Sequence, residues 1–267
     1  LSGIETVKKL VDEFDKLSDQ ICTVGLGIPG FSSKETGFVT NANSMWLNDK
    51  PFKKDLETAL KREVKLMNDA NCFTLSEAVD GAGKDYQSIF GIIVGTGFGG
   101  ALSYKKEIIE GANQIAGDWG HQPLPYPTKE EIETKINCPS MNCGRPLCAE
   151  QFMSGIGFKD VFNQKNNTNF SSEEIVQLDL DGDPRANLEL SLYEDRMARL
   201  MAVMIGIFDP DAIILGGGMS NIDRLYKNIP LLIPKYTFSN KVITKVIKNF
   251  HGDSSGVRGA AWLWNNV

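Results

Sequence analysis

The stretch "VKLMNDANCF", residues 64–73, is a short apolar run that ends abruptly in two amides and a carboxylate. Val64 and Leu66 belong to a predicted strand, and the letters NDAN follow it directly. By itself, NDAN favours a turn that caps a following helix, because Asn and Asp side chains accept hydrogen bonds from free backbone N–H groups. A cap leaves room for a second role, so the place of Asp69 at the end of a strand is the first question that the sequence raises.

Helical and strand patterns alternate on both sides of this stretch, which is typical of an α/β protein with helices on the faces of sheets. The predicted helices cover residues 4–17, 51–63 and 185–210, and further predicted strands lie within 22–30, 88–109 and 212–218. The two strands in 88–109 are joined through glycines, so we expect a hairpin there. The second half of the helix at 185–210 is almost wholly apolar, so we expect it to be buried.

Composition limits the classes of function. The 267 residues are 42% hydrophobic, which suffices for one large core or two smaller lobes. The 28 basic and 34 acidic residues give a net charge of −6, and no Lys/Arg run follows a phosphate backbone, which argues against nucleic acid as a partner. No stretch approaches the ~20 apolar residues that cross a bilayer, and the first residues do not follow the order of a signal peptide. We therefore expect no membrane partner and a cytoplasmic location.

Two glycine clusters, "VGTGFGG" at 94–100 and "LGGGMS" at 215–220, each follow an apolar strand. Residues without a side chain let backbone N–H groups approach an anion closely, and a helix after the second cluster would add its positive end. The candidate nucleotide-binding residues are Gly95, Thr96, Gly97, Gly99, Gly216, Gly217 and Gly218. A hairpin bulge and a tight strand-to-helix turn explain either cluster alone equally well. No G-x-x-x-x-G-K-[ST] motif occurs, so a nucleotide would have to lie between two lobes.

Three of the five cysteines lie between residues 138 and 148. His121 precedes Cys138 by seventeen residues, and Cys143 and Cys148 follow at steps of five. One imidazole and three thiolates suit a tetrahedral Zn²⁺ without an open position, which is a structural site. Buried thiols beside a surface histidine are the alternative.

Eight motifs in order along the chain resemble the ROK family of sugar kinases and repressors, with the greatest likeness to its bacterial fructokinase (mannokinase) branch. They are "VGLGIPG", "NANSMWLNDKPF", "NDANCFTLSEAVDGA", "GTGFGGAL", "GANQIAGDWGHQPLP", "CGRPLCAEQFMSGIGF", "DPDAIILGGGMSNIDRLY" and "HGDSSGVRGAAWLW". The resemblance implies an actin-like ATPase (ribonuclease H-like) fold, with two α/β lobes and a cleft between them. It also implies a homodimer that uses Mg²⁺ and ATP to phosphorylate a hexose at its terminal hydroxyl.

The resemblance also assigns roles to residues. Asp69 would be the general base that accepts the proton of the attacking sugar hydroxyl. The residues that would bind the sugar are Asn43, Asn68, Asp69, Asp118, His121 and Glu150. His121 would have two duties, because one ring nitrogen would bind zinc while the other faces the sugar.

This chain departs from the family pattern at three places. Asp118 stands where the family usually has Glu, which shortens the carboxylate and predicts weaker sugar binding. In the motif C-x-C-G-x-x-G-C, Met141 replaces the first cysteine and Leu147 the last glycine, so Cys138 is the substitute ligand upstream. The D-x-G-G-T phosphate loop is not found ahead of the helix at 4–17, so we expect a fragment that binds ATP weakly and turns over little.

We expect fructose as the substrate and fructose 6-phosphate as the product, because "NANSMWLNDKPF" and "MSNIDRLY" resemble the fructokinase branch most. A kinase for N-acetylglucosamine or glucose is the alternative within the family, and a non-catalytic sugar-binding regulator is the alternative outside catalysis. The small lobe is expected to contain residues 1–84 and the last helix, 256–267, and the large lobe residues 85–255 with the zinc motif. An ordinary terminal helix on the large lobe is the other interpretation of 256–267.

Overall fold

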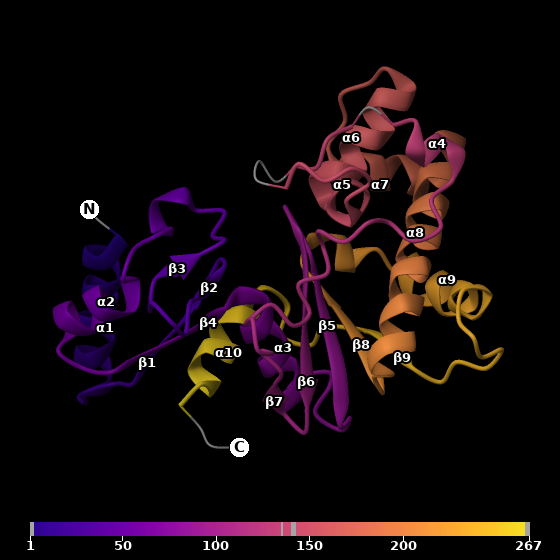
Figure 1. Ribbon diagram of the computed structural model, residues 1–267. Helices are drawn as coiled ribbons and strands as arrows, with labels where there is room; N and C mark the ends of the chain where they lie inside the picture. The colour runs from indigo at the N-terminus through magenta and orange to yellow at the C-terminus, as the bar shows by residue number, and fades with distance from the viewer. Residues whose placement is uncertain (1–2, 135, 140–142, 265–267) are drawn as a thin grey trace.

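The computed structural model describes residues 3–134, 136–139 and 143–264, and Figure 1 shows their arrangement. Met141 and the end of the segment 256–267 lie outside the described residues. The α-helices are α1 (Gly3–Ser18), α2 (Phe52–Leu60), α3 (Asp69–Val79), α4 (Lys129–Ile132), α5 (Ala149–Met153), α6 (Gly155–Asn166), α7 (Ser172–Leu180), α8 (Pro184–Phe208), α9 (Arg224–Leu232) and α10 (Ser255–Trp262). The strands are β1 (Val24–Ile28), β2 (Phe31–Ser32), β3 (Val39–Thr40), β4 (Val64–Asn68), β5 (Ser88–Val94), β6 (Phe98–Tyr104), β7 (Glu107–Ile108), β8 (Ala212–Gly216) and β9 (Lys245–Lys248). None of the helices described is long and apolar enough to span a membrane.

The N-terminal part of the molecule is built on a parallel pair of strands, β1 and β4, in which Val24 lies opposite Val64. The predicted helix at 51–63 is confirmed as α2, whose apolar face buries Phe52, Leu56 and Leu60 toward this pair. Each of these residues follows the previous one by four positions, so they share one side of the helix. A small separate core therefore forms around the strand that leads to Asp69.

The larger part contains a five-stranded sheet in the order β7-β6-β5-β8-β9. The predicted hairpin is confirmed, because β5 and β6 pair antiparallel with Ile92 opposite Gly100. β8 runs parallel to β5 and brings Gly216 opposite Ile93, so both glycine clusters emerge at the same end of the sheet. Helices α5 to α9 pack on this sheet and on one another around one large core.

The expected burial of the second half of α8 is wrong for one of its faces. Met197 and Met201 are fully buried, but Val203 is 41% exposed and Ile207 is 78% exposed. Because a helix turns every 3.6 residues, a segment that is apolar all round buries only the side that faces the core. Apolar composition alone therefore overestimated how much of this helix the core covers.

Helices α3 and α10 lie between the β1–β4 pair and the five-stranded sheet (Figure 1). A Cβ atom on Gly259 of α10 would lie 1.7 Å from the Cys72 carbonyl oxygen of α3, so only glycine permits this close approach. The buried Glu77 carboxylate joins the same elements, since it accepts hydrogen bonds from the backbone of Ala82 and Phe250 and from the Ser255 hydroxyl. This packing is compatible with the expected return of the last helix to the small lobe. The lobe boundary at residues 84 and 85 stays a prediction.

Candidate active site

Asn68 ends β4 and caps α3, as the turn chemistry of NDAN predicts. Its Oδ1 accepts hydrogen bonds from the N–H groups of Ala70 (2.9 Å) and Asn71 (3.3 Å), and its Nδ2 donates to the Gly30 carbonyl oxygen (3.1 Å). The cap therefore fixes the junction from which Asp69 projects. Most of the hydrogen-bonding capacity of Asn68 is used by the protein, which leaves one amide hydrogen for a ligand.

A pocket of about 390 Å³, here called the Asp69 pocket, opens in front of this junction. All six residues predicted to bind sugar line it together: Asn43, Asn68, Asp69, Asp118, His121 and Glu150. Solvent reaches Asp69 through the pocket. The surrounding protein nevertheless desolvates this carboxyl enough to raise its pKa above the usual 3.8. The hydrogen bond from the Ala70 N–H acts in the opposite direction and lowers the pKa.

The far wall of the Asp69 pocket is rigid because backbone contacts hold it. The N–H groups of Ala149 and Glu150 donate to the carbonyl oxygens of Gln122 and Gly120, each at 2.8 Å. The Glu150 carboxylate is buried and accepts a hydrogen bond from the Phe98 N–H at 3.1 Å. Glu150 is thus fixed between the start of α5 and the glycine hairpin, where it lines the pocket.

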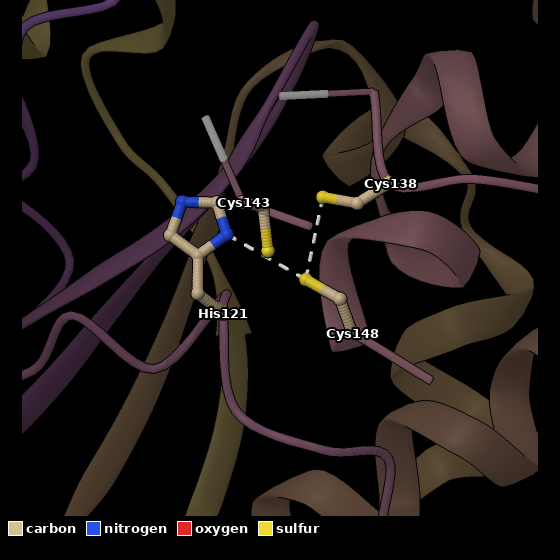
Figure 2. A group of neighbouring side chains, drawn as sticks. All are labelled: His121, Cys138, Cys143 and Cys148. Atoms are coloured by element: carbon tan, nitrogen blue, oxygen red, sulfur yellow. Dashed lines mark hydrogen bonds between the residues drawn. The ribbon is translucent and has the colours of Figure 1, made fainter. Parts of the chain in front are cut away.

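Behind this wall lies the cluster predicted from the cysteine spacing. Figure 2 shows His121, Cys138, Cys143 and Cys148 pointing toward one another, with one ligand atom from each within 4.8 Å of all the others. The Cys148 Sγ lies 3.4 Å from the Cys138 Sγ and 3.5 Å from the His121 Nδ1. Tetrahedral Zn²⁺ with Zn–S bonds of about 2.3 Å separates its ligand atoms by about 3.8 Å, so these residues fit one zinc ion.

The same cluster touches the pocket through His121. His121 lines the Asp69 pocket while its Nδ1 faces Cys148, and the other ring nitrogen lies on the side away from the sulfur atoms (Figure 2). Burial raises the pKa of the Cys148 thiol to about 11, so a metal ion has to displace a proton to bind there. The arrangement allows a structural metal to orient a pocket residue, which is the double duty predicted for His121.

A second, larger pocket of about 910 Å³, the Lys159 pocket, meets the first at Gly95 and Thr96, which line both. Of the other predicted glycines, Gly218 lines the Lys159 pocket, whereas Gly97 and Gly99 line the Asp69 pocket. A short 3-10 turn, η2 (Gly218–Asn221), follows the second cluster, and α9 begins only at Arg224. The positive end of a helix therefore does not directly follow these glycines.

Gly216 and Gly217 are not among the residues that line either pocket. A Cβ atom on Gly216 would lie 2.4 Å from the Phe73 ring, and one on Gly217 would lie 2.5 Å from the Val94 carbonyl oxygen. Gly217 also has a φ of +80°, a conformation that residues with a side chain rarely adopt. In this structure both glycines allow the turn after β8 to pack closely, as in the tight-turn alternative.

Sequence reasoning missed several residues that line the pockets. Asn71 and Gln114 line the Asp69 pocket, and Lys159 and Ser171 line the Lys159 pocket. Asn71 lay inside the NDAN motif and could have been included with its neighbours. Ser171 could have been found as the first residue of S-x-x-E, which forms a capping box at the start of α7. Gln114 lay inside the motif GANQIAGDWGHQPLP and could have been included with Asp118 and His121, whereas Lys159 lies just beyond the motif that ends at residue 158.

Comparison with known proteins identifies relatives of this chain. A family model described as ROK family matches residues 2–267. An N-acetyl-D-glucosamine kinase of Vibrio cholerae is 37% identical over 260 residues, which cover 97% of this chain and 86% of that protein. One of Pasteurella multocida is 37% identical over 263 residues, with coverage of 98% and 86%.

Two solved structures have the same fold. The ROK hexokinase from Thermus thermophilus matches with a TM-score of 0.81 and 23% identity, over 97% of this chain and 84% of that one. The ROK family glucokinase from Streptomyces griseus, solved with glucose and AMPPNP, matches with a TM-score of 0.80 and 22% identity, over 97% and 86%. The predicted actin-like ATPase fold, with two lobes and a cleft, is therefore confirmed.

The family resemblance of the motifs is confirmed, but the preference for its fructokinase branch is not supported. The curated relatives named above are called N-acetyl-D-glucosamine kinases, which agrees with the alternative drawn from the sequence. The chain belongs to the ROK family.

Proposed function

We propose that this protein is an ATP-dependent kinase that phosphorylates N-acetylglucosamine at its terminal hydroxyl. The observation that carries the proposal is the position of Asp69, which lines one pocket beside Gly95 and Thr96 while these two residues also line the next. A sugar in the Asp69 pocket and a nucleotide in the Lys159 pocket would meet at this shared wall. The names of the relatives from Vibrio cholerae and Pasteurella multocida support the choice of sugar.

In this proposal, Asp69 accepts the proton of the sugar hydroxyl as that oxygen attacks the terminal phosphorus of ATP, whose bond to the bridging oxygen breaks so that ADP leaves. Phosphoryl transfer passes through a loose transition state, so the carboxylate mainly orients the nucleophile, and general-base catalysis contributes roughly 10²–10⁴ in rate. The cap made by Asn68 supports this role, because it fixes the backbone on which Asp69 stands. Asn68, Glu150 and the free nitrogen of His121 would bind other hydroxyl groups of the sugar.

The nucleotide would lie with its phosphates at Gly95, Thr96 and Gly218. The side chains there are small or absent, so backbone N–H groups can approach the phosphates closely. Mg²⁺ would enter bound to the phosphates and neutralise their charge. Zn²⁺ would be held by His121, Cys138, Cys143 and Cys148 as a structural ion. A homodimer and a cytoplasmic location stay predictions from the sequence.

The test measures ADP release by the protein expressed from its complete gene, with N-acetylglucosamine, glucose, mannose and fructose offered separately. The proposal expects the highest kcat/KM with N-acetylglucosamine. A clear preference for fructose would overturn the choice of sugar and restore the fructokinase prediction. Sugar binding without ADP release would instead indicate a non-catalytic regulator.

A further inference from the structure

Two contacts connect the loop between β2 and β3 to the segment 109–118, here called the rim loop, across the mouth of the Asp69 pocket. The backbone N–H of Lys34 donates a hydrogen bond to the Gln114 Oε1 at 3.0 Å. The Lys34 ammonium lies 3.2 Å from the Glu110 carboxylate. Lys34 belongs to the N-terminal part of the molecule, whereas the rim loop follows β7 in the five-stranded sheet.

The rim loop forms one wall of the pocket. Gln114, Ile115, Ala116 and Asp118 all line the Asp69 pocket, opposite Phe31 and Asn43 from the other side. The loop is folded on itself, since the N–H of Ala116 donates to the Glu110 carbonyl oxygen at 3.2 Å and that of Asp118 to Ile115 at 3.1 Å. The position of Gln114 therefore constrains that of Asp118, because only three residues of hydrogen-bonded backbone separate them.

Gln114 is held in an unfavourable conformation for a residue with a side chain. Its φ is +58°, in the left-handed region that glycine and asparagine adopt more readily. The neighbouring Gly117 has a φ of +86° and lies so close to β6 that a Cβ atom would be 2.7 Å from the Ala101 Cα. The far end of the loop is thus anchored on the sheet, while its outer end depends on the contact with Lys34.

We propose that Lys34, Gln114 and Glu110 form a latch that holds the rim loop closed over the bound sugar and so positions Asp118. The inference rests on the proposed function, because it takes the Asp69 pocket as the sugar site. Gln114 and Glu110 are positioning residues that act through Asp118. The latch joins Lys34 on one side of the cleft to the rim loop on the other, so it favours the closed arrangement. None of its three residues takes part in the proposed phosphoryl transfer itself.

The two contacts have unequal weight. Lys34 and Glu110 are 62% and 38% exposed, and an ion pair so open to water adds little. The Gln114 hydrogen bond is also exposed, but its N···O distance of 3.0 Å is that of an ordinary hydrogen bond, and the loss of one such bond corresponds to roughly a two- to tenfold change in an equilibrium constant. Removal of the Gln114 acceptor should therefore matter more than removal of the Glu110 charge.

The test compares Gln114→Ala with Gln114→Glu by calorimetry with N-acetylglucosamine and by kinetics. Gln114→Ala removes the acceptor and should raise the Kd and KM for the sugar about two- to tenfold while kcat stays within about twofold. Gln114→Glu keeps an acceptor oxygen for the Lys34 N–H and should therefore weaken sugar binding less than Gln114→Ala does. Equal weakening by both variants would overturn the latch, since Gln114→Glu removes only the amide donor that a direct contact with the sugar would use. An unchanged Kd in Gln114→Ala would overturn it as well.

Hydrogen exchange without sugar gives an independent readout. The Lys34 amide should exchange faster in Gln114→Ala than in the unaltered protein, with Gln114→Glu close to the unaltered protein. If the unaltered protein binds no N-acetylglucosamine, the proposed function fails, and the exchange result alone decides whether the latch exists. Equal exchange at Lys34 in all three proteins would show that the contact does not form.

Discussion

The two pockets that meet at Gly95 and Thr96 are built in different ways. The Asp69 pocket places carboxylates, amides and an imidazole around a small volume. Asn68, Asp69 and Glu150 stand at the ends of strands and helices, and most of the other groups lie in loops. The Lys159 pocket is more than twice as large, and glycines, the loop before α7 and one face of α6 form its walls. One pocket depends on which functional groups are present, and the other depends on how closely the backbone can approach its ligand.

This difference predicts opposite sensitivities to mutation. In the Asp69 pocket the harmful change is the loss of a group, because a sugar hydroxyl that loses its partner is left unpaired. At the turn beside the Lys159 pocket the harmful change is the addition of atoms, because the backbone there is already in close contact. Substitutions in each pocket test this contrast directly.

The largest effect is expected from Asp69→Asn, which removes the proton acceptor while it keeps the size of the side chain. The kcat should fall at least a hundredfold, since general-base catalysis contributes roughly 10²–10⁴ in rate. The Kd for N-acetylglucosamine should change little, because the amide still offers an oxygen to the sugar hydroxyl. Steady-state kinetics and calorimetry on the same preparation measure both quantities.

Asp12→Asn is the matched control, because Asp12 pairs with Lys8 on the exposed surface of α1 and touches neither pocket. The pH profile adds a second readout. The protein around the Asp69 carboxyl shields it from bulk water and raises its pKa above 3.8. Only the ionised carboxylate accepts a proton, so kcat/KM should fall as the pH drops through this raised pKa. Asp69→Asn should lose this acid limb. A variant that keeps most of its turnover and the same limb would remove Asp69 from the mechanism.

The contrast between the pockets also explains what the sequence could predict. The turn chemistry of NDAN predicted the cap at the junction of β4 and α3, and the family resemblance of the surrounding motifs assigned Asn68, Asp69 and Glu150 to the site. Gln114 was missed although it lies in a quoted motif, because its contact with Lys34 forms only in the folded chain, and Lys159 was missed because its pocket is likewise formed by distant segments. No local pattern encodes such a meeting.

The fold itself was predicted more completely than its surfaces. Strand and helix periodicity located the β5–β6 hairpin and the buried faces of α2, because alternation and 3.6-residue spacing are local properties. The exposure of Ile207 could not be read from an apolar run, because it depends on where the core of the large lobe ends. Likewise, the roles of Gly216 and Gly217 depend on the distance to Phe73 and Val94, which lie far away in the sequence.

The second effect concerns the metal. Removal of zinc by a chelator, or Cys148→Ala, should raise the Kd for the sugar by roughly 10- to 100-fold, the loss typical when a residue that orients a site is released. The physical reason is that His121 and Glu150 would lose the cluster behind them. The Kd for ATP should change much less, because no cluster residue lines the Lys159 pocket.

Cys22→Ser is the control, because Cys22 lies outside the cluster and should retain both zinc and sugar binding. Metal analysis of the purified protein must accompany the binding measurement. Less than one zinc per chain in the unaltered protein, with full sugar affinity, would contradict the structural role of the metal. Equal weakening of sugar and ATP binding by Cys148→Ala would contradict the separation of the two pockets.

The smallest effect is expected at Gly217, where added atoms rather than a lost group should be harmful. Gly217→Ala adds a Cβ atom 2.5 Å from the Val94 carbonyl oxygen and forces a side chain into a φ of +80°, so the turn must shift. The free energy of unfolding should fall by about 1–3 kcal/mol. Because Gly218 directly follows Gly217 and lines the Lys159 pocket but not the Asp69 pocket, the KM for ATP should rise more than the Kd for the sugar. Gly206→Ala is the matched control, since a Cβ atom there meets nothing within 4 Å and alanine favours the helix by about 1 kcal/mol. Thermal unfolding and ATP kinetics on both variants decide the point, because a Gly217→Ala protein as stable and active as Gly206→Ala would mean that the turn after β8 has no influence on the Lys159 pocket.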